Sequence, residues 1–182
     1  MTVNHIQSKK VMPPQLVEWF RDDPLPDFVP TPTIIVGGRR LLKEFMRQTA
    51  LIGGDGVLAI AAGSLSADGL RLACDWTALD HSTLDLHLAT SGERSAKDAE
   101  RELGGFPWRS LHIRQSEGLH SKVYSFLSGT GASVCLIGSH NVSRSAMFTN
   151  TEAGLLALSY SPSWLTGIAA ACCSYVAGIE DS

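Results

Sequence analysis

The stretch GLHSKVYSFLSGTGASVCLIGSHNVSRSAMFTNTEAGLL, residues 118–156, contains the strongest indications of the fold. Residues 120–127 and 133–139 have the length and apolar content of strands, and the glycine-rich segment 128–132 between them predicts a hairpin turn. A third strand is expected at 152–160. The stretch therefore predicts part of a sheet whose strand ends carry polar and charged residues.

Similar patterns continue on the two sides of this stretch. Three further strands are predicted, at 57–65, 84–91 and 109–115. Three helices are predicted: within 37–52, from a capping box formed by Ser95 and Asp98 to Gly104–Gly105, and at 162–179, with Pro162 in its first turn. Strands interspersed with helices predict an α/β fold, a mixed β-sheet flanked by helices.

The composition fits one domain. At 182 residues, with 44% hydrophobic and 18% charged residues, the chain has enough apolar material for a core and too little charge for a disordered protein. No apolar run approaches the roughly 18–20 residues that cross a bilayer, and residues 1–15 hold no signal-peptide core. We therefore expect a cytoplasmic protein that does not contact a membrane. The net charge of −3 argues against a broad basic surface, although it says nothing of local patches.

The N-terminal region differs from the rest. Six of the eight prolines fall in residues 1–33, a density that disfavours long helices and central strands. We interpret 1–33 as an extended arm with one short helix at 16–22, followed by a single domain at 34–182.

The four cysteines show neither a C-x-x-C pair nor zinc-ligand spacing; they are Cys74, Cys135, Cys172 and Cys173. Because cytosolic disulfides are rare, we expect reduced thiols that act as small apolar side chains. A structural metal or a disulfide framework is not expected.

His120 and Lys122 are the first candidates for chemistry. They lie two residues apart on an expected strand, so their side chains leave the same face. Histidine serves as a nucleophile or proton carrier near neutral pH, and lysine is a fixed cation.

A second group follows the hairpin. Gly138 permits close backbone approach, and Ser139 and Asn141 supply neutral hydrogen-bond donors. The chain then enters an expected short helix, where exposed amides favour an anion. Glu152, eleven residues after Asn141, could hold an imidazole in one tautomer. Together with the histidine and lysine, these residues suit a phosphate ester.

These residues resemble the motif of the phospholipase D superfamily, H-x-K-x4-D followed by G-[SG]-x-N and a downstream acidic residue. The positions carried over are His120 and Lys122, then Gly138, Ser139 and Asn141, then Glu152. The resemblance is close over about 40 residues, and the expected element order from residue 57 onward agrees with that fold. One position departs, because Leu127 stands where the family has its aspartate.

The resemblance implies a mechanism that needs two motifs. One histidine attacks phosphorus and the other protonates the leaving oxygen, while lysine and asparagine hold the non-bridging oxygens, with no divalent metal or other cofactor. Since this chain has one motif, the resemblance implies a homodimer with a composite site. The resemblance favours a nuclease that cleaves DNA or RNA. Since no separate recognition domain is evident, we expect either weak sequence preference or targeting by a partner protein.

Two alternatives remain open at this stage. One is a phospholipase or phosphatidyl transferase. The other is a dimeric module that binds nucleic acid or acts as a scaffold and whose catalytic site has decayed, for which Leu127 is the main argument. A serine hydrolase lacks support because no G-x-S-x-G is present, and the glycines at 53, 54 and 56 do not follow a strand as a dinucleotide-binding loop would.

A cationic helix face is the remaining candidate for substrate contact. Within 37–52, the basic residues Arg39, Arg40, Lys43 and Arg47 fall opposite the apolar ones. The face is either solvated or a contact for a phosphate backbone, where each cation adds a salt-sensitive term.

Functional interpretations of three other residues have weaker support. His140 could join His120 and Glu152 as a metal ligand, although their spacing does not support it. His112 could line the cleft or be an ordinary surface histidine. Asn141 begins a glycosylation sequence, which a cytoplasmic location makes irrelevant.

Overall fold

The structure, a computed structural model, describes residues 15–19, 32–37, 41–77, 79–148, 150 and 152–181. These residues form one eight-stranded sheet in the order β1-β2-β8-β7-β6-β3-β4-β5. The strands are β1 Gln15–Trp19, β2 Thr33–Gly37, β3 Gly56–Ala62, β4 Leu84–Thr90, β5 Ser110–Gln115, β6 Lys122–Ser128, β7 Ser133–Gly138 and β8 Gly154–Ser159. Pairing is antiparallel from β2 through β8, β7 and β6 to β3, and parallel elsewhere. The predicted mixed sheet is confirmed.

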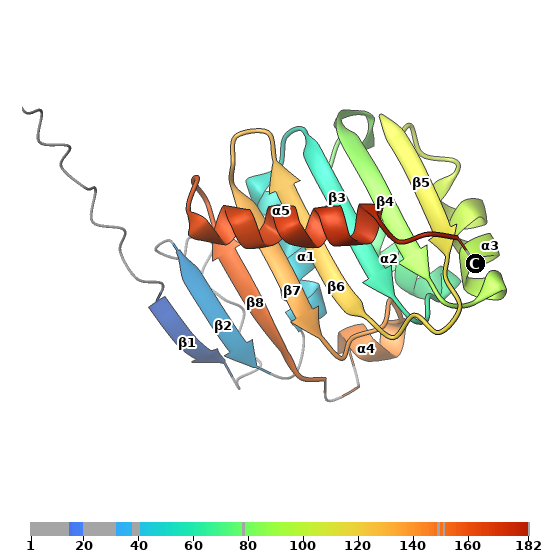
Figure 1. Cartoon of the computed structure of the whole chain (residues 1–182), viewed down its shortest axis with the longest axis horizontal. Coiled ribbons are helices and arrows are strands. Elements are labelled where there is room, and N and C mark those ends of the chain that lie inside the picture. Colours follow the sequence, from blue (N-terminus) through green and yellow to red (C-terminus); the bar gives the residue numbers. More distant parts are fainter. Residues whose placement is uncertain are drawn as a thin grey trace, which may run out of the picture.

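Helices cover both faces of the sheet. They are α1 Leu41–Ile52, α2 Ala67–Thr77, α3 Glu93–Leu103, α4 Arg144–Phe148 and α5 Trp164–Ala177, with a short 3-10 helix at His81–Thr83. α5 crosses one face, whereas α1 and α2 lie behind the opposite face (Figure 1). The molecule is therefore built in three layers, with the sheet in the middle.

The central strand β6 supplies both apolar layers by simple alternation. Tyr124 and Phe126 are fully buried in the larger cluster, where the Tyr124 ring lies 5.8 Å from that of Phe45 on α1. Val123 and Leu127 point the other way, into the smaller cluster beneath α5. Burying a large apolar side chain stabilises a fold by roughly 1.5–3 kcal/mol, so the alternation fixes which face of β6 meets which helix.

The N-terminal prediction needs a correction. The short helix expected at 16–22 is wrong, because Gln15–Trp19 is the strand β1, paired in parallel with β2. A helix confined between the prolines on either side of this segment would be too short to be stable alone. Pairing with β2 instead supplies hydrogen bonds to its backbone. Apart from residues 32 and 33, the rest of the expected arm lies outside the described residues.

Local signals also misplaced two helix starts. α3 begins at Glu93 after Gly92, and Ser95 does not cap it; its hydroxyl lies 3.3 Å from the backbone nitrogen and oxygen of Leu65. The helix ends at Gly104 as predicted. α5 is capped by Ser163, so Pro162 precedes the helix instead of forming its first turn. β2 and α2 were not predicted at all.

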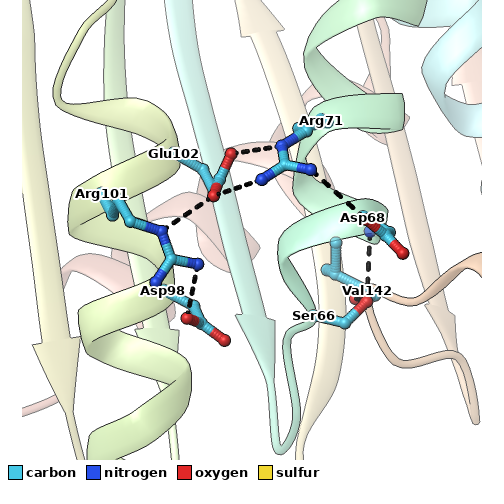
Figure 2. A network of polar contacts seen from close by, with 8 residues as sticks. Ser66, Asp68, Arg71, Asp98, Arg101, Glu102 and Val142 are labelled. Atoms are coloured by element: carbon cyan, nitrogen blue, oxygen red, sulfur yellow. Dashed lines mark hydrogen bonds and ion pairs between the residues drawn. The ribbon is translucent and has the colours of Figure 1, made fainter.

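A polar network joins α2 to α3 (Figure 2). Arg71 binds Glu102 through two nitrogens, at 2.6 and 2.9 Å, and reaches Asp68 at 3.5 Å. Arg101 contacts the same Glu102 at 3.0 Å and Asp98 at 2.8 Å. Glu102 of α3 is the acceptor that both arginines share. Its bonds to Arg71 of α2 therefore fix how the two neighbouring helices are aligned.

Within the described part of the chain, no helix is both long enough and apolar enough to span a bilayer.

Charge pairing also joins the outer strands. Asp85 on β4 accepts hydrogen bonds from the guanidinium of Arg109 and, at 2.7 Å, from the hydroxyl of Ser110 on β5. The Arg109 bonds, followed by the Ser110 bond, lower the pKa of Asp85 to about 2. An ionised Asp85 therefore stabilises the fold above the unfolded-state pKa of about 3.9, and this contribution is lost as the pH falls toward 2.

Asp85→Asn should therefore destabilise the protein at neutral pH but not in strong acid. Chemical denaturation at a series of pH values should give a wild-type advantage that is constant above about pH 4 and shrinks toward pH 2. Asp68→Asn, which removes a carboxylate 3.5 Å from its arginine, is the matched control and should show a smaller pH-dependent difference. An Asp85→Asn difference that does not change with pH would contradict the assignment.

Candidate active site

Four strand ends meet at one edge of the sheet. β6 begins beside the end of β7 because the two strands are antiparallel. β3 ends there too, with Ala62 opposite Lys122, and β8 begins there, with Gly154 opposite Gly138. We call this the polar edge; α4 lies beside it (Figure 1). Six predicted site residues meet at this edge: His120, Lys122, Gly138, Ser139, Asn141 and Glu152.

His120 is exposed and lies two residues before β6, which starts at Lys122 and not at residue 120 as predicted. The Lys122 ammonium donates to the His120 backbone oxygen at 2.8 Å, so the lysine folds back toward the histidine. Gly63 lets the chain before His120 pass close by, since a Cβ there would lie 2.7 Å from the Leu119 oxygen, whereas the Lys122 nitrogen, at 3.5 Å, would be in ordinary contact. The cation is thereby held close to the chain segment that carries the imidazole.

Asn141 is oriented by the loop that follows β3. Its side-chain oxygen accepts a hydrogen bond from the Ser64 backbone nitrogen at 3.2 Å. Since the oxygen is occupied by a backbone donor, the amide N–H groups are what Asn141 can offer to a ligand. Two N–H donors beside a lysine suit the non-bridging oxygens of a phosphate.

The Asn141 loop is also fixed through Val142. The Val142 nitrogen donates to the Ser64 oxygen at 3.2 Å, and the Ser66 nitrogen donates to the Val142 oxygen at 2.9 Å. In Figure 2, Ser66 and Val142 lie next to each other, below Asp68 at the start of α2. The loop is thus anchored to α2 and, through Arg71, to α3.

A buried tyrosine supports the same loop from below. The hydroxyl of Tyr124 donates to the backbone oxygen of His140 at 2.7 Å, and both residues are fully buried. Burial, and to a smaller extent the charge of Glu152, raises the pKa of Tyr124 far above its ordinary value. The phenol therefore stays protonated and remains a donor.

Glu152 is engaged within its own chain. Ser139 donates its hydroxyl proton to one carboxylate oxygen, and the Asn150 amide donates to the other at 3.1 Å. The Ser139 hydroxyl in turn accepts from the Ala153 nitrogen at 3.0 Å. The expected contact between this carboxylate and an imidazole stays a prediction, because the described partners of Glu152 are Ser139 and Asn150.

Gly138 has a packing reason to be glycine. A Cβ at this position would lie 2.5 Å from the Ala153 oxygen, 2.9 Å from the Gly154 Cα and 2.9 Å from Nδ1 of His140. The two glycines face each other across β7 and β8. Any side chain would therefore displace the backbone next to Ser139 and Glu152.

The cationic face of α1 is only partly available. Arg39 and Arg40 lie outside the described residues. Arg47 contacts Glu44 at 2.7 Å, and the Glu44 side chain is only 4% exposed, so the arginine balances a buried charge inside α1. Lys43 lies 6.0 Å from the centre of the Phe148 ring. Arg47 is therefore engaged within α1, and contact of Lys43 or Arg47 with a phosphate backbone stays a prediction.

Of the other histidines, His112 lies away from the site, and His140 is buried within the loop that bears Asn141. His112 stacks on His87 with ring centres 4.7 Å apart, on β5, three strands and roughly 14 Å from β6. It does not line the cleft. His140 is fully buried whereas His120 is exposed. Within the described residues, no group of three or more histidine, cysteine or acidic side chains could hold a metal ion.

Two solved structures are similar to this chain in fold. NucT from Helicobacter pylori matches 81% of this chain and 93% of its own, with a TM-score of 0.53 and 15% identity. Nuc from Salmonella typhimurium, described as a phospholipase D family member, matches 79% of this chain and 93% of its own, with a TM-score of 0.50 and 14% identity. The chain has the phospholipase D fold. No protein-family sequence profile and no curated protein sequence matches it.

In this phospholipase D fold, Leu127 occupies a position remote from the polar edge. It packs beneath α5, in the cluster that also contains Val57 and Val176. Leu127 lies five positions after Lys122 along β6, which is roughly 16 Å of strand, and the odd spacing turns the two side chains to opposite faces. The absence of an aspartate at this position therefore removes no group from the candidate site.

Sequence reasoning missed the contribution of the loop after β3. Gly63 and Ser64 lie at the site, but they were interpreted as the end of a strand. The signal was a Gly-Ser pair directly after an apolar run, and only its distant partners Lys122 and Asn141 give it meaning.

Gly138→Ala should lower the free energy of unfolding by about 1–3 kcal/mol, the usual cost of forcing a methyl group into a filled space. Denaturant unfolding followed by circular dichroism measures it. Gly105→Ala is the control, because nothing lies within 4 Å of a Cβ there. Equal stabilities of the two variants would show that the backbone at Gly138 gives way easily.

Proposed function

We propose that the protein is a metal-independent phosphodiesterase, a nuclease that cleaves DNA or RNA through a phosphohistidine intermediate in a homodimeric site. The observation that carries the proposal is the meeting of His120, Lys122 and Asn141 at one edge of a phospholipase D fold. Imidazole, ammonium and oriented amide are the groups that attack phosphorus and stabilise the charge on its oxygens.

The first step would form the covalent intermediate. An imidazole nitrogen of His120 attacks phosphorus while the ester bond to the leaving oxygen breaks. The partner's His120 gives that oxygen its proton. Lys122 and the N–H groups of Asn141 bind the non-bridging oxygens, where negative charge develops.

The second step would restore the enzyme. The partner's His120, now neutral, takes a proton from water, and the resulting hydroxide attacks phosphorus. The bond between phosphorus and His120 breaks, releasing a phosphate monoester. Lysine and amide donors supply the charge stabilisation that other phosphodiesterases obtain from bound cations, which is why we expect activity in a chelator.

The need for a second copy follows from the histidines of one chain. Of the described histidines, His120 is the exposed one at the polar edge; His140 is buried, and His112 lies on β5. One chain therefore offers either a nucleophile or a general acid. A twofold axis through the polar edge would bring together one of each.

The decayed-module alternative loses its main argument. It rested on Leu127, and that residue packs beneath α5, away from Lys122 and Asn141.

The phospholipase alternative is tested by comparing which substrates the protein cleaves. Incubation in EDTA with single-stranded DNA, duplex DNA, RNA and phosphatidylcholine should give cleavage of a nucleic acid and not of the lipid.

His120→Ala should lower turnover by orders of magnitude, because no other group at the polar edge can both attack phosphorus and leave it. Hydrolysis of a generic phosphodiester in EDTA measures this. Since His120 is exposed, the variant should melt like wild type. His112→Ala, which changes a histidine three strands away, should keep full activity. If His120→Ala retains more than about a tenth of the rate, a barrier change below roughly 1.4 kcal/mol, the nucleophile is misassigned.

The composite site makes a separate quantitative prediction. When wild-type and His120→Ala chains exchange subunits, each site needs two intact copies of His120, so activity should fall as the square of the wild-type fraction. Rates measured across a series of mixing ratios, after exchange is verified by mass, give the curve. A linear decrease, or an active monomer in sedimentation, would rule out the shared site.

A further inference from the structure

Cysteine side chains of β7 and α5 meet between the sheet and this helix. Cys135 lies on β7 and is buried, while Cys172 and Cys173 lie on α5, the first half-buried and the second buried. The Cys135 thiol donates to the sulfur of Cys172 at 3.3 Å. A disulfide needs about 2.05 Å, so the two sulfurs must approach by only about 1.3 Å.

The two thiols have unequal reactivity. The hydrogen bond from Cys135 holds the pKa of Cys172 below its ordinary value. The same bond, together with burial, raises the pKa of Cys135. Cys172 is also the more exposed of the pair, so it is the nucleophile and Cys135 the thiol that follows.

We propose that Cys135 and Cys172 form a reversible disulfide when a peroxide oxidises the protein. The Cys172 thiolate attacks one oxygen of hydrogen peroxide; an S–O bond forms, the O–O bond breaks, and the departing hydroxide takes up the thiol proton as water. The Cys135 thiol then attacks the sulfenic sulfur; the S–S bond forms, the S–O bond breaks, and a second water leaves. Two thiols lose two electrons, and one peroxide becomes two waters.

The disulfide would connect α5 covalently to β7, at a position three residues before Gly138. Tyr175, three residues after Cys172 on α5, shares a hydrogen bond with the hydroxyl of Ser121, which stands between His120 and Lys122. A link at Cys172 therefore restrains the helix that contacts the segment carrying the nucleophile. It also closes a loop of about 38 residues, which lowers the freedom of the unfolded chain.

Peptide mapping of the full-length protein tests the link directly. Protein that has been reduced, freed of reductant and treated with hydrogen peroxide should lose two thiols, and digestion should yield a Cys135 peptide joined to a Cys172 peptide. The midpoint of thermal unfolding should rise on oxidation and return after dithiothreitol. A link to Cys173 or Cys74, sulfinic acid at Cys172 without a link, or an unchanged midpoint would overturn the proposal.

Variants give the matched comparison. Cys135→Ser and Cys172→Ser should each abolish the link and the rise in melting temperature, whereas Cys173→Ser should keep them. Because a serine at buried Cys135 could destabilise the fold, the wild-type peptide map decides on its own. The His120→Ala protein should form the same disulfide, so this test and the test of the phosphodiesterase fail independently.

Discussion

The antiparallel pairing of β6 with its two neighbours is the constraint on which the site depends. The register sets Ala62 opposite Lys122 on one side and Val123 opposite Ile137 on the other. A shift by one residue would turn Tyr124 and Phe126 out of the larger apolar cluster and turn Val123 and Leu127 into it. Core packing thus selects the one register in which the lysine stands beside the ends of β3 and β7.

The segments that were predicted correctly are those whose own residue pattern indicates their structure. Alternating apolar residues placed β4 and β5, and the pattern around residues 120 and 140 placed the polar edge. The segments that were missed depend on distant partners. β1 exists because β2 lies beside it, and Ser95 does not cap α3 because its hydroxyl contacts Leu65. No local pattern encodes such contacts. The sequence therefore indicated the residues at the ends of β6 and β7 but not the loop at Ser64 that orients Asn141.

Much of the positive charge in the described part of the chain is used internally. Arg47 is paired with buried Glu44, Arg71 and Arg101 share Glu102, and Arg109 is paired with Asp85. On the proposed function, an approaching phosphodiester would find these four arginines already balanced by carboxylates of the chain. In the proposed site, short contacts at the polar edge would supply attraction for the anion, because Lys122 and the Asn141 amide are held in place there.

The hydrogen bond from Tyr124 to the His140 backbone has a consequence for ligand binding. The loop that bears Asn141 cannot be displaced without leaving a buried phenol and a buried carbonyl unpaired, which costs about 1–3 kcal/mol for each group. The ordering of this loop is therefore completed when the chain folds, and a substrate of the proposed site would meet donors already in position. Affinity at this loop is not reduced by an entropic cost of arranging it, and slow conformational gating is not expected there.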